Sequence, residues 1–146
     1  MTPQRIVLLI GLPGSGKSTW AAAQGWNALS SDALRLLLSD NIANQNIHGR
    51  VFAAIRYLLR QRLRTGCAIN CIDATHLTRA ERRPYFGLAR WHNAVVEAVY
   101  FDVPFSTVLA RNRTRSRQVP ETAIARMAAR LEPPQWEEGY HSITCI

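Results

Sequence analysis

The pattern of hydrophobic and polar residues alternates short apolar runs with longer segments of helical periodicity. Apolar runs at residues 5–10, about 27–30, 67–72 and 95–101 are expected to form strands, and 141–146 is a candidate fifth strand. Apolar runs that alternate with helical segments are typical of βαβ units, which join parallel strands of one sheet. The pattern therefore predicts a central parallel sheet of four to five strands.

Helices are expected between these runs, and the segment 47–64 has the clearest helical pattern. Its apolar residues recur every three or four positions, as a helix with one buried face requires. Gly66 is suited to end this helix. The other helices are expected at 18–23, from about Asp32, at 78–92, from Pro104 toward Arg111, and at 120–131. Helices around a parallel sheet predict a three-layer α/β fold, and we expect one domain over residues 1–146.

A glycine-rich sequence joins the first strand to the first helix. Residues 11–18 match the phosphate-binding pattern G-x-x-x-x-G-K-[ST] at every fixed position. Glycines let backbone N–H groups wrap around an anion, and the helix N-terminus adds partial positive charge. This motif predicts a P-loop fold and binding of ATP with Mg²⁺. The expected nucleotide-binding residues are Gly14, Ser15, Gly16, Lys17, Ser18 and Thr19.

Three of these residues have distinct expected roles. Lys17 is expected to reach the β- and γ-phosphates, and the Ser18 hydroxyl to bind Mg²⁺. Thr19 is placed to donate to the α-phosphate. The correct strand before the motif and helix after it make an incidental glycine-rich turn a poor explanation.

The composition narrows the class of nucleotide-binding protein. No apolar run reaches the roughly 18 residues that span a bilayer, so we expect a cytoplasmic protein without a membrane partner. A GTPase-type guanine site needs N-K-x-D, but Lys17 is the sole lysine, and no D-x-x-G switch occurs. A motor or AAA-type ATPase normally needs a longer chain than 146 residues. A small kinase remains.

The chain is strongly basic, with a net charge of +8 and seventeen arginines among its 18 basic residues. Arginine presents planar, forked donors that suit phosphate, which favours an anionic polymer as partner. An excess of arginine over lysine can equally reflect genomic base composition and a solvated surface. Charge by itself therefore does not identify the partner.

Acidic residues follow the second and third expected strands, where ligands of such sheets bind. Asp32 could accept the proton of an attacking hydroxyl. Arg35 lies three positions later on the same helix face, where it could bind an acceptor phosphate or hold the Asp32 carboxylate. Taken alone, Asp32 is better explained as a helix N-cap. Its place at a carboxyl strand end favours the catalytic role.

The segment 73–83 opens with Asp73, in a place where such folds orient water bound to Mg²⁺ or an active-site arginine. Thr78 and Glu81 form a capping-box pattern, so helix initiation explains part of the segment. Thr75 and His76 are interpreted as polar loop residues without a catalytic role. The four histidines of the chain show no metal-ligand spacing, so no zinc site is expected.

Four arginines at a spacing of two lie between residues 111 and 117, with no carboxylate among them. Either this segment is a solvated charge cluster, or it closes over the triphosphate as a lid. A lid arginine would stabilise negative charge on the transferring phosphoryl group. We expect one or two of the four to act in this way and the others to be solvated or to contact a polyanion.

In order and spacing, these motifs resemble the polynucleotide 5′-kinase module of nucleic-acid end-repair enzymes. The resemblance covers the G-L-P-G-S-G-K-S-T-W loop, S-D-x-x-R, D-A-T-H-L-T-R-A-E-R-R and Y-F-D-V-P leading to R-N-R-T-R. It implies transfer of the γ-phosphate of ATP to the 5′-hydroxyl end of DNA or RNA. The implied roles are Asp32 as general base, Arg35 as acceptor clamp, Arg115 as lid arginine, Arg111 on the adenine side, and Asp73 as the residue that orders the catalytic arginine or water.

Two departures and two alternatives accompany the resemblance. No D-x-D occurs, so a fused haloacid-type phosphatase is not expected, and the chain would act alone or with separate end-repair enzymes. Relatives with the same loop include small-molecule kinases, so a metabolite acceptor is the first alternative. An ATP-gated nucleic-acid-binding module without turnover is the second.

Overall fold

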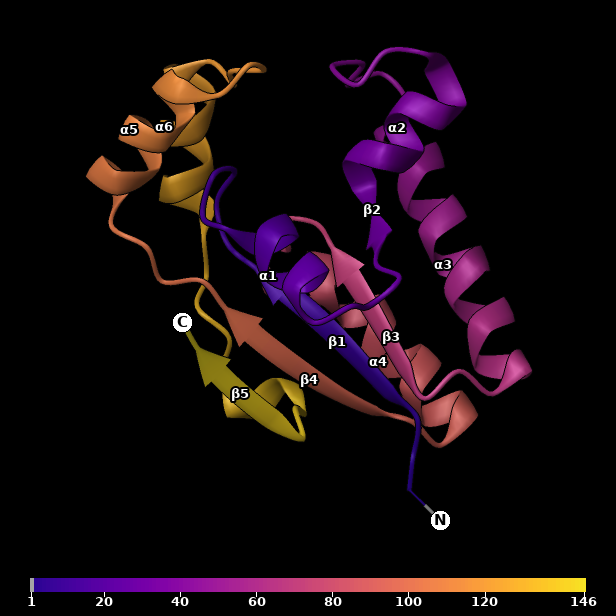
Figure 1. Ribbon diagram of the computed structural model, residues 1–146. Helices are drawn as coiled ribbons and strands as arrows, with labels where there is room; N and C mark the ends of the chain where they lie inside the picture. The colour runs from indigo at the N-terminus through magenta and orange to yellow at the C-terminus, as the bar shows by residue number, and fades with distance from the viewer. Residues whose placement is uncertain (1) are drawn as a thin grey trace.

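The computed structural model describes residues 2–146 and contains one five-stranded parallel sheet flanked by six α-helices (Figure 1). The strands are β1 (Arg5–Ile10), β2 (Leu29–Ser30), β3 (Ile69–Asp73), β4 (Val95–Tyr100) and β5 (Ser142–Cys145). Their order across the sheet is β2-β3-β1-β4-β5, and every pair is parallel. The predicted α/β fold with a central parallel sheet is confirmed.

The helices are α1 (Lys17–Ala23), α2 (Ser31–Ser39), α3 (His48–Thr65), α4 (Arg79–His92), α5 (Phe105–Thr114) and α6 (Glu121–Arg130). A short 3₁₀ turn, η1 (Trp136–Glu138), precedes β5. Gly66 ends α3 in a left-handed conformation, as its position predicts. No helix in residues 2–146 is long and apolar enough to cross a membrane.

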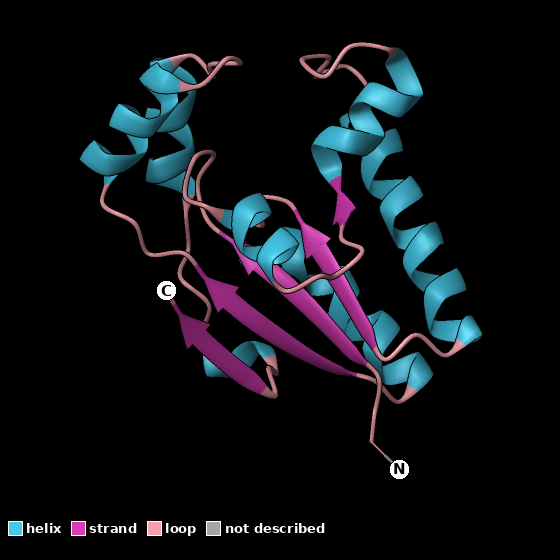
Figure 2. Ribbon diagram, viewed as in Figure 1, coloured by secondary structure: helices cyan, strands magenta, loops and turns pink. Residues whose placement is uncertain are grey.

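Helices cover both faces of the sheet because alternate residues of β1 point to opposite sides (Figure 2). Ile6, Leu8 and Ile10 pack with the buried stripe of α3 and with α4. Val7 and Leu9 pack on the other face, where Ala21 of α1 lies. A third apolar cluster joins α5 and α6 to the start of the phosphate loop. The three-layer arrangement therefore follows from a central strand that is buried on both faces.

Several boundaries differ from the predicted ones. The second strand is only Leu29–Ser30, and the third begins at Ile69 and includes Asp73. The helix after Pro104 is expected to end near Arg111, but it continues to Thr114, so Arg113 is helical and not part of a loop. A helical turn needs only compatible side chains, and the arginine-rich run contains no glycine or proline that would stop it.

The register of the sheet brings three strand ends to one edge. Ser30 pairs with Asp73 across β2 and β3, and Leu9 pairs with Asp73 across β1 and β3. Two helix pairs rise beyond this edge, α2 with α3 on one side and α5 with α6 on the other (Figure 1). Ligands of open α/β sheets bind beyond the carboxyl ends of the strands, so this edge is where a site is expected.

Candidate active site

The phosphate loop turns sharply between β1 and α1 because glycines adopt conformations that other residues avoid. Gly14 and Gly16 have φ values of 81° and 101°, in the left-handed region. A Cβ atom added at Gly11 would lie 2.7 Å from the Ser15 hydroxyl oxygen. The glycines of the motif are therefore required by the path of the backbone around the loop.

Lys17 begins α1 and is buried, with 8% of its surface exposed. Its ammonium group donates to the carbonyl oxygens of Gly11 at 3.0 Å and Leu12 at 2.8 Å. Burial lowers the pKa of Lys17 to about 8, against the carboxylates of Asp73 and Asp32, which raise it. The amine is thus held at the loop in an environment where the additional negative charge of a phosphate would stabilise its protonated form.

Ser18 and Asp73 meet beside Lys17. The Ser18 hydroxyl donates to Asp73 Oδ2 at 2.6 Å, and Asp73 is buried at the end of β3. The sequence suggests that Asp73 orders water or an arginine, whereas in the structure its direct partner is Ser18. A hydroxyl and a carboxylate oxygen are ligands that suit Mg²⁺, so this pair fits a magnesium ion. The sequence could have predicted this pairing, because Asp73 ends β3, the strand next to β1.

Asp32 lies in the first turn of α2 and is free of a capping role. The N-cap is Ser30, whose hydroxyl accepts from the Ala33 N–H at 3.2 Å. Asp32 is therefore not the N-cap, although capping would have explained it from the sequence alone. Its side chain is 53% exposed and lines the cavity described below.

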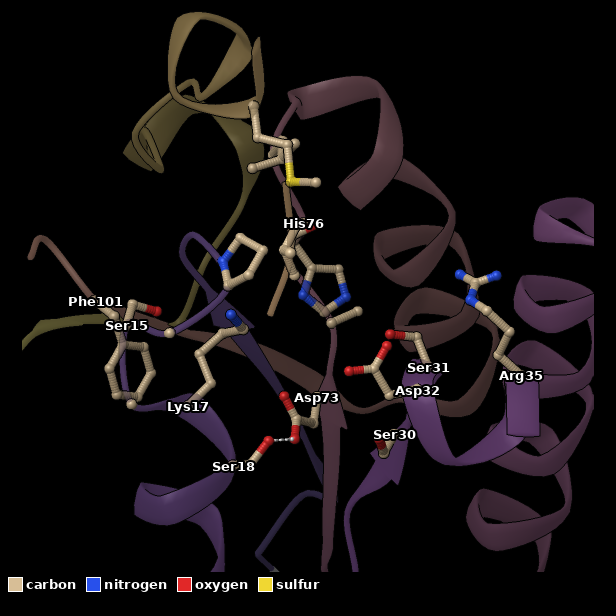
Figure 3. Close-up of a pocket in the computed structure, with 18 of the residues that line it drawn as sticks. Ser15, Lys17, Ser18, Ser30, Ser31, Asp32, Arg35, Asp73, His76 and Phe101 are labelled. Carbon is tan, nitrogen blue, oxygen red and sulfur yellow. Dashed lines mark hydrogen bonds between the residues drawn. The ribbon is translucent and has the colours of Figure 1, made fainter. Parts of the chain in front are cut away.

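Arg35 is buried, one turn further along α2. Its Nη1 donates to the Asn44 carbonyl at 3.2 Å. No ion pair between Arg35 and Asp32 occurs in the described chain, so Arg35 does not hold that carboxylate in place. Figure 3 shows the Arg35 guanidinium at the side of the cavity, separate from Asp32.

The four arginines of segment 111–117 divide into two groups. Arg111 Nη1 donates to the Gly14 carbonyl at 3.4 Å, and an Arg115 nitrogen would lie 3.9 Å from a Cβ added at Gly14. Arg117 approaches Asp32 Oδ2 at 3.7 Å. Arg113 pairs with Glu121 at 2.7 Å and does not line the cavity. Three of the four therefore line the cavity, where one or two are expected to act on the phosphates.

A single cavity of about 1220 Å³ collects all of the residues predicted for the site. Figure 3 shows Lys17, Ser18 and Asp73 on one side of it and Asp32 and Ser31 on the other. The predicted residues that line it are Gly14, Ser15, Gly16, Lys17, Ser18, Thr19, Asp32, Arg35, Asp73, Arg111 and Arg115. Among the other lining residues, the sequence predicts no role in the site for His48, Phe52, Arg56 and His76.

Three polar atoms of the cavity are buried without a hydrogen-bond partner in the described chain. They are Ser15 Oγ, Arg115 Nη1 and His76 Nε2. Buried donors without partners are costly, by about 1–3 kcal/mol each. The first two are donors beside the phosphate loop, so a bound phosphate would satisfy both. The loop therefore fits a nucleotide phosphate on its own geometry.

A family model described as an AAA domain matches residues 6–134. The chain belongs to this AAA domain family. The matched segment runs from β1 through α6. It includes every residue that lines the cavity except Ile146. Because the chain is short, an AAA-type ATPase is not expected from the sequence. The match to an AAA domain shows that this length does not exclude the family. A search of curated proteins found no match to the sequence.

Solved structures with the same fold as this AAA domain act on different substrates. A chain of the Pnkp1/Rnl/Hen1 RNA repair complex has a TM-score of 0.74 and 19% identity, over 90% of this chain and 45% of that one. A gluconokinase from Sinorhizobium meliloti 1021 has a TM-score of 0.65 and 20% identity, over 99% and 82%.

The APS kinase CysC of Mycobacterium tuberculosis, solved with AMPPNP and APS, has a TM-score of 0.60 and 17% identity, over 99% and 90%. The present chain spans less than half of the RNA repair chain that it resembles. At these identities the comparisons establish a P-loop kinase-like fold. They do not single out the polynucleotide kinases among proteins with that fold.

Proposed function

We propose that the chain is an ATP-dependent polynucleotide kinase that transfers the γ-phosphate to the 5′-hydroxyl end of DNA or RNA. The observation that carries the proposal is the position of Asp32. Its carboxylate is free of capping, lines the same cavity as Lys17, and raises the pKa of that lysine through its charge. A base and a phosphate site therefore face one cavity of about 1220 Å³, which exceeds the usual size of a site for one small ligand.

The proposed reaction uses this arrangement in one displacement. The acceptor hydroxyl gives its proton to the Asp32 carboxylate while its oxygen forms a bond to the γ-phosphorus. The bond between that phosphorus and the bridging oxygen breaks, and ADP leaves. Lys17 and Arg115 stabilise the negative charge on the transferring group. Ser18 and Asp73 would hold Mg²⁺, which would neutralise charge on the phosphates when bound.

Arg35 and the basic charge of the chain support a polyanionic acceptor. Arg35 is buried on the same helix as Asp32, and within residues 2–146 one of its nitrogens makes a hydrogen bond, to the Asn44 carbonyl. Its remaining donors could bind a backbone phosphate that follows the 5′-nucleoside. Arg56 of α3 lines the same cavity.

A small-metabolite kinase is the second candidate, and the comparisons favour it on coverage. The gluconokinase and APS kinase match 82% and 90% of their own length, against 45% for the RNA repair chain. A phosphotransfer screen with γ-labelled ATP, Mg²⁺, 5′-OH DNA, 5′-OH RNA and a panel of polyols and nucleosides distinguishes the two. Label on a metabolite, unaffected by competing oligonucleotide, would replace the first proposal with the second.

The decisive variant is Asp32→Asn, which keeps the size of the side chain and removes the base. We expect kcat for a 5′-OH oligonucleotide to fall by about 10²–10⁴ while the Kd for ATP stays unchanged. Asp40→Asn is the matched control, because Asp40 ends the same helix in a left-handed conformation that asparagine tolerates, and it lies outside the cavity. Oligonucleotide binding without any turnover in the wild type would instead indicate an ATP-gated binding module.

A further inference from the structure

His76 has a backbone conformation that its place in the fold does not explain. Its φ is 49°, in the left-handed region. Two further non-glycine residues share this region in residues 2–146, Asp40 and Asn93, and both end helices as C-caps. His76 ends no helix and lies in the loop between β3 and α4. Strain of this kind persists where the surroundings fix it, and it clusters at functional sites.

The surroundings of His76 fix both its backbone and its ring. Arg82, which is fully buried and paired with Glu138 at 2.9 Å, donates to the His76 carbonyl at 2.8 Å. The ring stands edge-on to Tyr85, with 5.5 Å between centroids. Nδ1 lies 2.5 Å from the Leu9 carbonyl oxygen, which can only accept, so Nδ1 must carry the ring proton.

The other ring nitrogen is consequently a buried acceptor without a partner. His76 is 2% exposed, and burial, helped by the charges of Lys17 and Arg82 and opposed by nearby carbonyls, lowers its pKa to about 4. The ring is therefore neutral at physiological pH. Nε2 makes no hydrogen bond in the described chain. Figure 3 shows the ring in the cavity between Lys17 on one side and Ser31 and Asp32 on the other.

A lone pair at this position selects what can bind beside it. Phosphate oxygens carry no proton at neutral pH and would be repelled by Nε2, so the triphosphate is not its partner. The reacting hydroxyl has a single proton, which the proposed reaction gives to Asp32. The partner of Nε2 must therefore carry a hydrogen-bond donor other than the reacting hydroxyl.

We infer that His76 Nε2 accepts a hydrogen bond from a hydroxyl or N–H group of the acceptor that lies beside the phosphorylated hydroxyl. This inference rests on the proposed function and adds a specificity-determining residue to it. On a 5′-nucleoside end, the donor is either the ribose 2′-hydroxyl or an N–H group of the base. Acceptors that lack such a donor leave the buried nitrogen unsatisfied and are bound less tightly.

His76→Asn tests the inference because it removes Nε2 and keeps a donor for the Leu9 carbonyl. The asparagine amide can donate to the Leu9 carbonyl in place of Nδ1, and asparagine tolerates the left-handed backbone. We expect KM for a 5′-OH oligoribonucleotide to rise about tenfold, with kcat changed less than twofold and the Kd for ATP unchanged. Tm should fall, because the smaller side chain leaves a cavity beside Tyr85. His92→Asn is the matched control, since His92 Nε2 is also buried without a partner but lies outside the cavity.

The outcomes separate this inference from the proposed function. If the wild type labels oligonucleotides and His76→Asn has the same KM, the inference is wrong and the proposed function stands. If the wild type labels no oligonucleotide, the proposed function fails first and the inference fails with it. A rise in KM for RNA but not for DNA of the same sequence assigns the donor as the 2′-hydroxyl, and an equal rise for both assigns it as a base N–H.

A measurement on the wild type covers the case in which the variant does not fold. The ¹⁵N resonance of His76 Nε2 should move toward lower chemical shift when a saturating 5′-OH oligoribonucleotide binds, because a new hydrogen bond reduces the availability of its lone pair. An unchanged resonance would overturn the inference.

Discussion

At the scale of single residues, Lys17 couples nucleotide binding to a proton. Burial lowers the pKa of the ligand-free amine to about 8, although Asp73 and Asp32 oppose the shift. A triphosphate beside the amine favours the charged form, so the pKa rises when ATP binds. Because the bound state holds more protons than the free state above pH 8, ATP affinity must fall as the pH rises through that value.

We expect the Kd for ATP to be about tenfold higher at pH 9 than at pH 7, since the ligand-free amine loses most of its charge over this range. Isothermal titration calorimetry at both pH values measures the change. Lys17→Met should bind ATP weakly and with little pH dependence. A wild-type Kd that is the same at both pH values would show that the amine stays charged in the free protein.

The residues of the site were predictable to the extent that topology places them. Asp32 and Asp73 follow neighbouring strands, and parallel strands end at the same edge, so their proximity follows from the sequence. His76 was not predictable, because its role depends on a left-handed backbone and on Arg82, which is held by Glu138, 56 residues further along the chain. No local pattern carries that information.

At the scale of elements, Asn112 ties the loop between α5 and α6 to α5. Its side-chain amide donates to the Val119 carbonyl at 2.7 Å, and its oxygen accepts from the Val119 N–H at 2.8 Å. Asn112 is 2% exposed, so both hydrogen bonds are shielded from water. These two hydrogen bonds hold together the ends of the loop that carries Arg115 and Arg117.

Asn112→Asp keeps the acceptor and replaces the donor with an oxygen that faces the Val119 carbonyl. We expect a loss of about 1–3 kcal/mol in the free energy of unfolding, and faster hydrogen exchange in residues 113–119. kcat should fall more than the Kd for ATP rises, because Arg115 and Arg117 would be less well positioned in the cavity. Gln118→Glu is the control, as Gln118 is exposed and bonds only to the Arg113 carbonyl at 2.9 Å. Unchanged exchange in the loop would contradict this role of Asn112.

Elements with strong patterns were predicted well, and those formed by tertiary contacts were not. The limits of β1 and the C-cap of α3 agree with the hydrophobic pattern and with Gly66. The second strand has only two residues in the sheet, both paired with β3, so its length depends on its partner. The end of α5 was misplaced because the arginines suggested a loop, whereas the chain turns only at Arg115, which closes the helix in an extended conformation.

At the scale of the whole molecule, two helix pairs stand over the carboxyl edge of the sheet and supply basic residues to one cavity (Figure 1). Arg35 and Arg56 come from α2 and α3, and Arg117 comes from the loop between α5 and α6. The chain carries a net charge of +8. A nucleic acid that contacts these groups must release the counterions condensed on its phosphates, which a neutral metabolite cannot do.

Salt dependence therefore separates a polyanionic acceptor from an uncharged one. Three phosphate contacts on a single strand predict a slope of about −2 for the logarithm of affinity against the logarithm of salt concentration. KM for a 5′-OH oligonucleotide should then rise roughly 16-fold between about 50 and 200 mM salt, in steady-state assays at saturating ATP.

Arg56→Gln should reduce the slope by about 0.7. Arg64→Gln provides the control, since Arg64 lies on the same helix but outside the cavity. Equal slopes for both variants would place the polyanion away from α3, and turnover that salt leaves unchanged would favour an uncharged metabolite.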